Sequence, residues 1–158
     1  MPLSEVEDQI FSSGMLGPGL AIAPDSGPVV SPVDGKVLLV TAIGHAYGIR
    51  SASGVELLIH VGMDTVKLDG KGFTPHVKAG DKVRRGTPLV DVDWAAIKAA
   101  GYETVTPVVV SNAAVFDVIR GTSSTEVVPG SLFSGRLGAF PGSNIMMVRS
   151  HEVQWVLK

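Results

Sequence analysis

The sequence of 158 residues is long enough for one compact domain with its own hydrophobic core. Hydrophobic residues make up 45% and charged residues 18%, a composition typical of a globular protein and not of a disordered one. The formal net charge of -2 argues against nucleic acid as the main partner, because binding to a phosphate backbone requires a basic surface. The chain has no cysteine, which excludes both a disulfide scaffold and a thiolate metal site.

The 19 Gly and 10 Pro residues lie between short apolar runs, a pattern typical of all-β domains. In chain order, the runs rich in Val, Ile and Leu predict strands at 29–30, 35–41, 46–50, 55–62, 88–92 and 108–111. A short helix is expected at 93–100, with Asp93 as its N-cap and Gly101 at its end. Residues 77–90 read as a short charged hairpin between two Gly-centred turns. Together these elements predict an all-β fold, an antiparallel β-sandwich or barrel-sandwich with at most one or two short helices.

Two histidines, His45 and His60, lie on either side of a predicted turn at residues 51–54. A symmetric hairpin centred on Ala52 and Ser53 would place these histidines directly opposite each other, with their side chains on the same face. A one-residue bulge at Gly54 would shift that register. The sequence therefore predicts two imidazoles side by side.

Two neighbouring imidazoles are suited to phosphoryl transfer. A neutral imidazole is a good nucleophile at physiological pH, and it can accept a phosphoryl group on Nε2 if a carbonyl holds its Nδ1–H. The second ring can donate a hydrogen bond to the phosphoryl oxygens, and such transfer requires mainly positioning and charge stabilisation. No nucleotide is needed when the phosphate already comes from another histidine.

Two other interpretations of these histidines remain open at this stage. A single histidine in a strand is usually structural. A metal pair is the second alternative, because zinc needs three or four protein ligands and Asp64 could supply a third.

Several motifs around the two histidines closely resemble the glucose-type enzyme IIA family of the bacterial sugar phosphotransferase system. They are PVDG at 32–35, GHA at 44–46, GVE at 54–56, LIHVGMDTV at 58–66, GKGF at 70–73 and TPVVVSN at 106–112. The resemblance covers about residues 2–133, which we expect to form the enzyme IIA phosphocarrier domain. Residues 134–158 fall outside it and form a tail of uncertain origin.

The resemblance implies a β-sandwich with a shallow apolar depression around the site. It implies that His60 is phosphorylated, that His45 supports the transfer, and that the carbonyl of Gly62 orients the His60 ring. The residues that it implies for partner docking are Phe11, Leu58 and Val66 on an apolar rim, and the carboxylates Asp8 and Asp64. For any one of these apolar residues, core packing is the alternative, and either carboxylate could instead be a solvated loop residue.

The chain departs from the family at one position near the site. The family usually has a threonine two residues before the first histidine, where its hydroxyl helps to hold that ring, but this chain has Ile43. The resemblance therefore leaves the orientation of the His45 ring without its usual support. His76 and His151 match none of the motifs and are expected on the surface.

The resemblance also implies partners and a location. It predicts that the phosphocarrier protein HPr is the phosphate donor and that an enzyme IIB domain of a sugar permease is the acceptor, with no cofactor and no metal. The N-terminal residues are acidic, without the apolar stretch of a signal peptide, and no apolar run approaches the ~20 residues that span a bilayer. We therefore expect a cytoplasmic protein or a cytoplasmic domain of a membrane permease, with no membrane contact except through the permease.

Two rival functions have weaker support in the sequence. A zinc β-sandwich hydrolase of the lysostaphin type resembles this chain in the His60 to Asp64 spacing, but such enzymes also have a His-x-His pair, which is missing here. A non-enzymatic biotinyl-like module would need a lysine at a hairpin tip between apolar residues. Lys82 lies in a suitable region, but its charged neighbours Asp81 and Arg84 do not fit.

Overall fold

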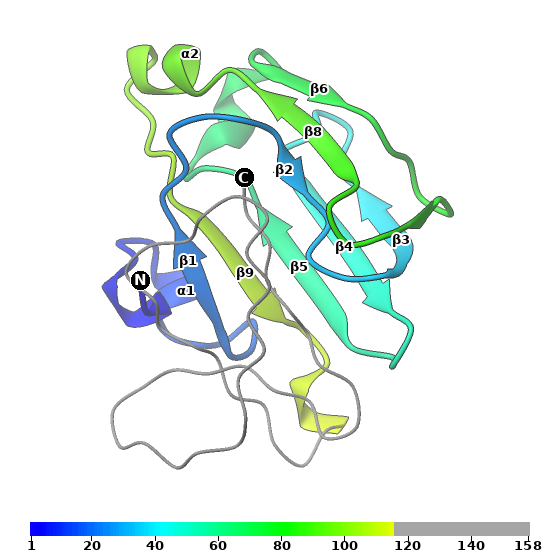
Figure 1. Ribbon diagram of the computed structural model, residues 1–158. Helices are drawn as coiled ribbons and strands as arrows, with labels where there is room; N and C mark the ends of the chain where they lie inside the picture. Colours follow the sequence, from blue (N-terminus) through cyan, green and yellow to red (C-terminus); the bar gives the residue numbers. More distant parts are fainter. Residues whose placement is uncertain (116–158) are drawn as a thin grey trace.

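The computed structural model describes residues 1–115, which form two antiparallel β-sheets packed face to face (Figure 1). The larger sheet has the strand order β1 (Gly19–Ile22), β9 (Thr106–Val110), β5 (Glu56–His60), β4 (Ala46–Ser51), β3 (Gly35–Val40), β7 (Lys82–Val83). The smaller sheet has the order β2 (Val29–Val30), β8 (Pro88–Val92), β6 (Phe73–Pro75). The predicted antiparallel sandwich is confirmed, whereas the predicted boundary at residue 133 and the tail at 134–158 lie outside the described residues.

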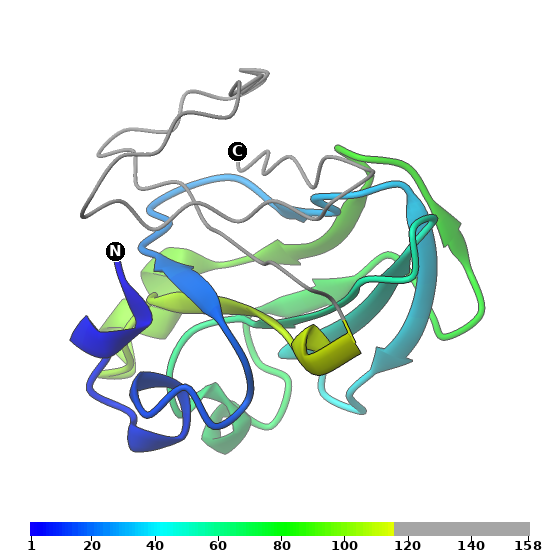
Figure 2. The same ribbon diagram turned by 90° about the horizontal axis from the view of Figure 1, so that it is seen from below.

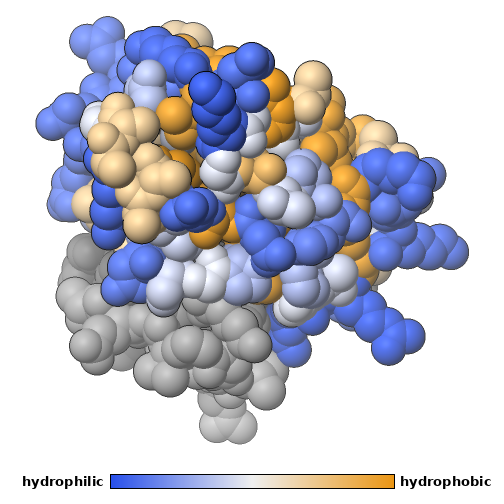
Figure 3. All heavy atoms as spheres, turned by 90° about the horizontal axis from the view of Figure 1, so that it is seen from above, coloured by the Kyte–Doolittle hydropathy of each residue, from blue (hydrophilic) through white to orange (hydrophobic). Residues whose placement is uncertain are grey.

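The helices are short. They are α1 (Gln9–Ser12) and α2 (Trp94–Ala99), together with 3₁₀ turns at Leu3–Glu5, Thr65–Leu68 and Ala113–Val115. The predicted cap of α2 is present, because the Asp93 carboxylate accepts a hydrogen bond from the backbone N–H of Ala96 at 2.9 Å. Trp94 and Ile97 face the core from this helix. The end of the molecule that carries α2 and β6 shows hydrophilic residues interspersed with apolar ones (Figure 3).

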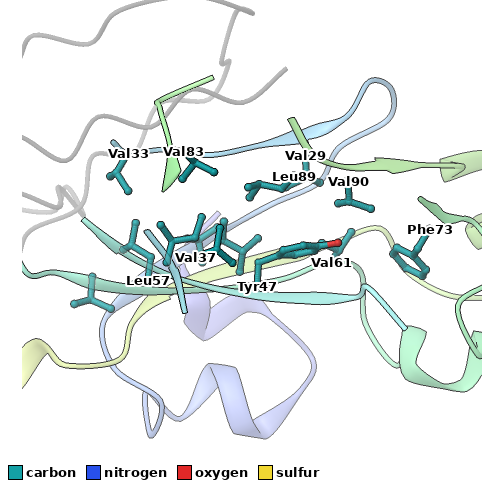
Figure 4. Close-up of a cluster of buried hydrophobic side chains, with 14 of the residues drawn as sticks. Val29, Val33, Val37, Tyr47, Leu57, Val61, Phe73, Val83, Leu89 and Val90 are labelled. Carbon is teal, nitrogen blue, oxygen red and sulfur yellow. The ribbon is translucent and has the colours of Figure 1, made fainter. Parts of the chain in front are cut away.

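The main core lies between the two sheets. Val37, Tyr47, Leu57 and Val61 come from the larger sheet or its immediate edge and meet Leu89 of the smaller sheet (Figure 4). Strand β5 alternates between the two faces, as an amphipathic strand must, so that Leu57 and Ile59 point into this core. Glu56, Leu58 and His60 therefore lie on the outer face of the larger sheet.

A second apolar cluster covers part of that outer face. Leu3, Val6 and Phe11 of the N-terminal segment pack against Ala21 of β1 and Val109 of β9. The N-terminal helical turns accordingly lie against the β1–β9 side of the sheet in both views (Figures 1 and 2). This segment places α1 next to the end of β5.

The expected hairpin at residues 77–90 is wrong. Its first strand, β7, pairs with β3 in the larger sheet, whereas β8 pairs with β2 and β6 in the smaller one. The segment between them crosses from one sheet to the other, and Gly86 N–H donates to the carbonyl of Ser31 at 2.8 Å on the way. The turn residues were read correctly as turns, but they join the two layers instead of closing a hairpin.

Candidate functional site

The two histidines lie at the end of the β4–β5 hairpin, but they are not partners in the register. His60 pairs with Ala46, and Arg50 pairs with Glu56, one residue away from the predicted pairing. The cause is a three-residue turn at Ala52–Gly54, in which Ser51 N–H donates to the Val55 carbonyl at 2.8 Å and Gly54 adopts a φ of 89°. The prediction that His45 faces His60 in the ladder is therefore wrong.

The imidazoles nevertheless meet. Their ring centroids are 5.1 Å apart, with planes at 81° in an edge-to-face arrangement. His60 is the last residue of β5 and lies on the outer face, whereas His45 precedes β4 in the loop that joins it to β3. The backbone carbonyl of His45 accepts a hydrogen bond from Val61 N–H at 2.7 Å, which fixes this loop to the end of β5.

The Gly62 carbonyl determines the tautomer of His60. It lies 2.7 Å from His60 Nδ1, and since a carbonyl can only accept, Nδ1 must carry the proton. The neutral ring then has its lone pair on Nε2, which is the atom available as a nucleophile.

The turn after β5 holds the Gly62 peptide in place. Gly62 has a φ of 71°, and a Cβ built on it would lie 2.5 Å from Cγ2 of Thr65 and 2.9 Å from the carbonyl oxygen of Glu103, so only glycine fits. Gly62 N–H donates to the Thr106 hydroxyl at 3.3 Å, and the buried Thr65 hydroxyl donates to the Val61 carbonyl at 2.6 Å. The carbonyl that orients His60 is thus part of a rigid turn.

Both imidazoles are held in the neutral form. Burial lowers the pKa of His60 below its ordinary value of 6.5, and this outweighs the Gly62 carbonyl and the carboxylates of Asp8 and Asp64, which raise it. Burial also lowers the pKa of His45, and the neighbouring His60 lowers it further. At neutral pH the site therefore offers one unprotonated nitrogen on each ring.

The three apolar residues expected to dock a partner differ in burial. The Phe11 ring lies 5.4 Å from the His60 ring between centroids, and this residue is buried in the second apolar cluster. Leu58 is half-buried against the same cluster, whereas Val66 is 54% exposed. Phe11 therefore borders the His60 ring, Leu58 lies on the same face of β5 as His60, and the Val66 side chain is exposed.

The two carboxylates also lie near His60. Asp8 caps α1 by accepting a hydrogen bond from Ile10 N–H at 2.7 Å. Asp64 lies in a left-handed conformation, with a φ of 57°, and forms an ion pair with Lys67 at 2.9 Å. Both act on the pKa of His60 through their charge, so both lie within electrostatic reach of its ring.

The sequence reasoning missed one polar side chain at the site, that of Thr41. Its hydroxyl oxygen lies 3.1 Å from His45 Nδ1. Thr41 precedes His45 by four residues across a loop, and neither a motif nor a periodicity signals that contact. Ile43, at the position where a hydroxyl was expected, has no polar side-chain atom to offer.

The features that the rival functions need are not assembled in the described part of the chain. Within residues 1–115, no group of three His, Asp or Glu side chains could hold a metal ion. Lys82 lies inside β7 opposite Lys36 and not at a hairpin tip, which disfavours a biotinyl-like module. His76 is exposed, as expected, and pairs with Asp91 at 2.7 Å, whereas His151 lies outside the described residues.

A family model and several known proteins match this chain. Residues 1–116 match a family described as phosphoenolpyruvate-dependent sugar phosphotransferase system, EIIA 1. The glucose-specific EIIA component of Oceanobacillus iheyensis is 42% identical over 130 residues, which cover 82% of this chain and 79% of that protein. The β-glucoside-specific EIIBCA component of Bacillus subtilis is 56% identical over 110 residues, 70% of this chain, but the match covers only 18% of that longer protein.

A solved structure matches the fold as well. The glucose permease IIA from Mycoplasma capricolum superposes with a TM-score of 0.69 at 37% sequence identity, over 76% of this chain and 79% of that one. Among the described residues, no helix has the length and apolar character that crossing a bilayer would require.

Proposed function

Because the chain belongs to the EIIA 1 family of the phosphoenolpyruvate-dependent sugar phosphotransferase system, we propose that it carries a phosphoryl group on Nε2 of His60. The observation that carries this proposal is the 2.7 Å bond from His60 Nδ1 to the Gly62 carbonyl. That bond leaves the lone pair of Nε2 unprotonated at a half-buried position beside a second imidazole.

The proposed reaction is a direct transfer between histidines. Nε2 of His60 attacks the phosphorus of a phosphohistidine on the donor, a bond forms between Nε2 and phosphorus, and the bond to the donor nitrogen breaks. The Nδ1 proton of His60 stays on its ring throughout, held by the Gly62 carbonyl. Onward transfer repeats this exchange with His60 as the leaving group.

His45 supports the transfer in this proposal without itself being phosphorylated. Its ring lies against that of His60, where a protonated nitrogen can donate a hydrogen bond to the phosphoryl oxygens. A fixed donor that meets developing charge stabilises the transition state without reorganising, which is worth more in a half-buried site than in water.

The partners we propose are HPr as donor and an enzyme IIB domain as acceptor. Phe11 is buried beside the His60 ring, whereas the half-buried Leu58 and the exposed Val66 offer apolar surface to a partner. Asp8 and Asp64 add negative charge at the edge. Such a surface suits a partner with an apolar patch and a basic rim. Both exchanges would take place in the cytoplasm.

The test is phosphorylation with phosphoenolpyruvate, enzyme I and HPr, followed by intact mass. We expect one acid-labile phosphoryl group on the parent chain and none on His60→Gln. His76→Gln is the matched control, because that histidine is exposed on the smaller sheet and should leave the labelling unchanged. Full labelling of His60→Gln would contradict the assignment.

A further inference from the structure

The hydroxyl of Thr41 occupies a fixed place between the backbone of β4 and the ring of His45. Thr41 N–H donates to the Ala46 carbonyl at 3.1 Å, and Ala46 N–H donates to the Thr41 hydroxyl oxygen at 3.0 Å. The same oxygen lies 3.1 Å from His45 Nδ1. Thr41 thereby closes the loop that carries His45 and touches its ring.

The contacts of the Thr41 hydroxyl favour one direction for its hydrogen bond to His45. A hydroxyl has one proton to donate and two lone pairs, and one lone pair of Thr41 is engaged by Ala46 N–H. Its proton can go to His45 Nδ1 at 3.1 Å or to the Ala46 carbonyl at 3.4 Å. The carbonyl already accepts a bond from Thr41 N–H, and Nδ1 is the nearer acceptor, so the geometry favours donation from the hydroxyl to Nδ1.

We propose that Thr41 is a positioning residue that holds His45 as its Nε2–H tautomer, so that Nε2 can donate a hydrogen bond to the phosphoryl group on His60. This inference rests on the proposed function, since it assigns a purpose to the tautomer. The tautomer of His45 can be measured in the unphosphorylated protein, so that part of the proposal does not depend on the phosphoryl group.

The two rings then have opposite and complementary tautomers. The Gly62 carbonyl can only accept, so His60 carries its proton on Nδ1 and offers a lone pair on Nε2. The Thr41 hydroxyl donates, so His45 offers a lone pair on Nδ1 and carries its proton on Nε2. One ring is thus prepared as the nucleophile and the other as the hydrogen-bond donor. Burial keeps both neutral by lowering each pKa, so the tautomers persist at neutral pH.

Thr41 can perform this task although it lies four residues from His45. Two hydrogen bonds join Thr41 to Ala46, one from its backbone N–H and one accepted by its hydroxyl, and Gly44 N–H donates to the Thr41 carbonyl at 2.9 Å. The loop between Thr41 and Ala46 is therefore short and closed, and it brings the His45 ring back over the hydroxyl. Ile43 in the same loop has no donor that could replace this contact.

The test compares Thr41→Val, which removes the hydroxyl at nearly constant shape, with Thr41→Ser, which keeps it. Thr74→Val is the matched control, because Thr74 is exposed on β6 and pairs with Asp91 of the smaller sheet. Imidazole ¹⁵N–¹H correlation spectra of the unphosphorylated proteins report the tautomer of His45. We expect the Nε2–H form in the parent, Thr41→Ser and Thr74→Val, and a mixture of tautomers in Thr41→Val.

The same variants are then loaded from phospho-HPr and mixed with the enzyme IIB domain. Onward transfer from Thr41→Val should be slower by on the order of tenfold, the effect typical of losing a group that orients a functional imidazole. Loading of His60 should be unchanged, and Thr41→Ser should restore the rate. His45→Gln shows how slow onward transfer becomes when the His45 ring is absent.

An Nδ1–H tautomer of His45 in the parent chain would overturn the proposal even if Thr41→Val failed to fold. An unchanged tautomer and an unchanged transfer rate in a folded Thr41→Val would overturn it as well. These outcomes are distinct from a failure of the proposed function, which would appear as a parent chain that takes up no phosphate on His60.

Discussion

The carboxylate of Asp64 is the most exposed charge beside His60. It pairs with Lys67 at 2.9 Å, but both side chains are more than half exposed, and such pairs contribute little to stability. A basic partner can therefore displace Lys67 at small cost. The ion pair also means that Lys67 opposes any basic partner that Asp64 attracts.

We expect Asp64→Asn to weaken association with HPr by roughly threefold to tenfold at low salt, and to reduce the dependence of binding on salt. Asparagine is the informative substitution, because it tolerates the left-handed backbone at this position and removes only the charge. Lys67→Gln should have the opposite effect, since it removes the competing cation. Stopped-flow association over a range of salt concentrations measures both.

Asp91→Asn is the control for this pair of variants, because Asp91 lies on the smaller sheet beside His76. Association rates that respond equally to the changes at 64 and at 91 would show that docking does not use this edge of the site.

At the scale of single residues, the sequence predicted the contact between His60 and the Gly62 carbonyl because both lie in the motif at 58–66, and it predicted that the His45 ring lies near that of His60. His60 and Gly62 are two residues apart, so their contact is local and the motif contains it. The Thr41 contact crosses a loop, and its geometry depends on the backbone pairing with Ala46. Side-chain contacts of that kind follow from the fold and not from spacing.

At the scale of elements, two glycines with similar backbone conformations differ in the space around them, so substitutions there distinguish backbone strain from steric crowding. Gly54, in the β4–β5 turn, has a φ of 89° and open space around a would-be Cβ. Gly62 has a φ of 71° and would place a Cβ against Thr65 and Glu103. At either position, alanine would adopt a left-handed backbone conformation that costs about 1–2 kcal/mol. Only at Gly62 would its Cβ also be overpacked against neighbouring atoms.

We therefore expect Gly54→Ala to lower the free energy of unfolding by about 1–2 kcal/mol, and Gly62→Ala to lower it by at least about 1 kcal/mol more. Gly62→Ala should also reduce phosphate uptake, because the peptide that orients His60 must move. Urea unfolding and phosphate loading measure the two effects. Equal stabilities for both variants, or full loading of Gly62→Ala, would show that the turn after β5 adapts without disturbing the site.

The β4–β5 turn also shows why element boundaries were better predicted than register. The apolar runs marked both strands closely, but the turn holds three residues because Ser51 bonds locally to Val55 through its backbone and its side chain. A slip of one residue would turn Glu56 and His60 toward the core in place of Leu57 and Ile59. The alternation in β5 therefore favours the observed register, and the prediction was wrong because it assumed a symmetric turn.

At the scale of the molecule, the sandwich was predictable from the many short Val-rich runs and the turn residues between them. The pairing of β7 with β3 was not, because Lys82 and Val83 form a two-residue strand whose partner lies far away in sequence. The strand β1 was not predicted, for a related reason. It contains Gly and Ala, which have low strand propensity, and it is stabilised as a strand by pairing with β9. Both elements depend on tertiary contacts.

The neutral histidine pair links the stability of the whole molecule to pH. Since the folded state lowers the pKa of His45 and of His60 below 6.5, the unfolded chain binds more protons than the folded one just below that pH. The full stability is therefore present above pH 6.5. It declines as the pH falls from 6.5 through the lowered values of the folded state.

The double variant His45→Gln/His60→Gln removes this linkage and leaves every other titrating group in place. We expect urea midpoints of the parent chain to fall between pH 7.5 and pH 5.5, and those of the double variant to fall less over the same interval. The absolute stability of the variant at pH 7.5 can differ, because glutamine replaces the ring packed on Phe11, but this offset does not depend on pH. The comparison therefore rests on the slope with pH. Parallel slopes for the two proteins would mean that the histidines titrate in the folded state as they do in the unfolded chain, and that burial does not hold the site neutral.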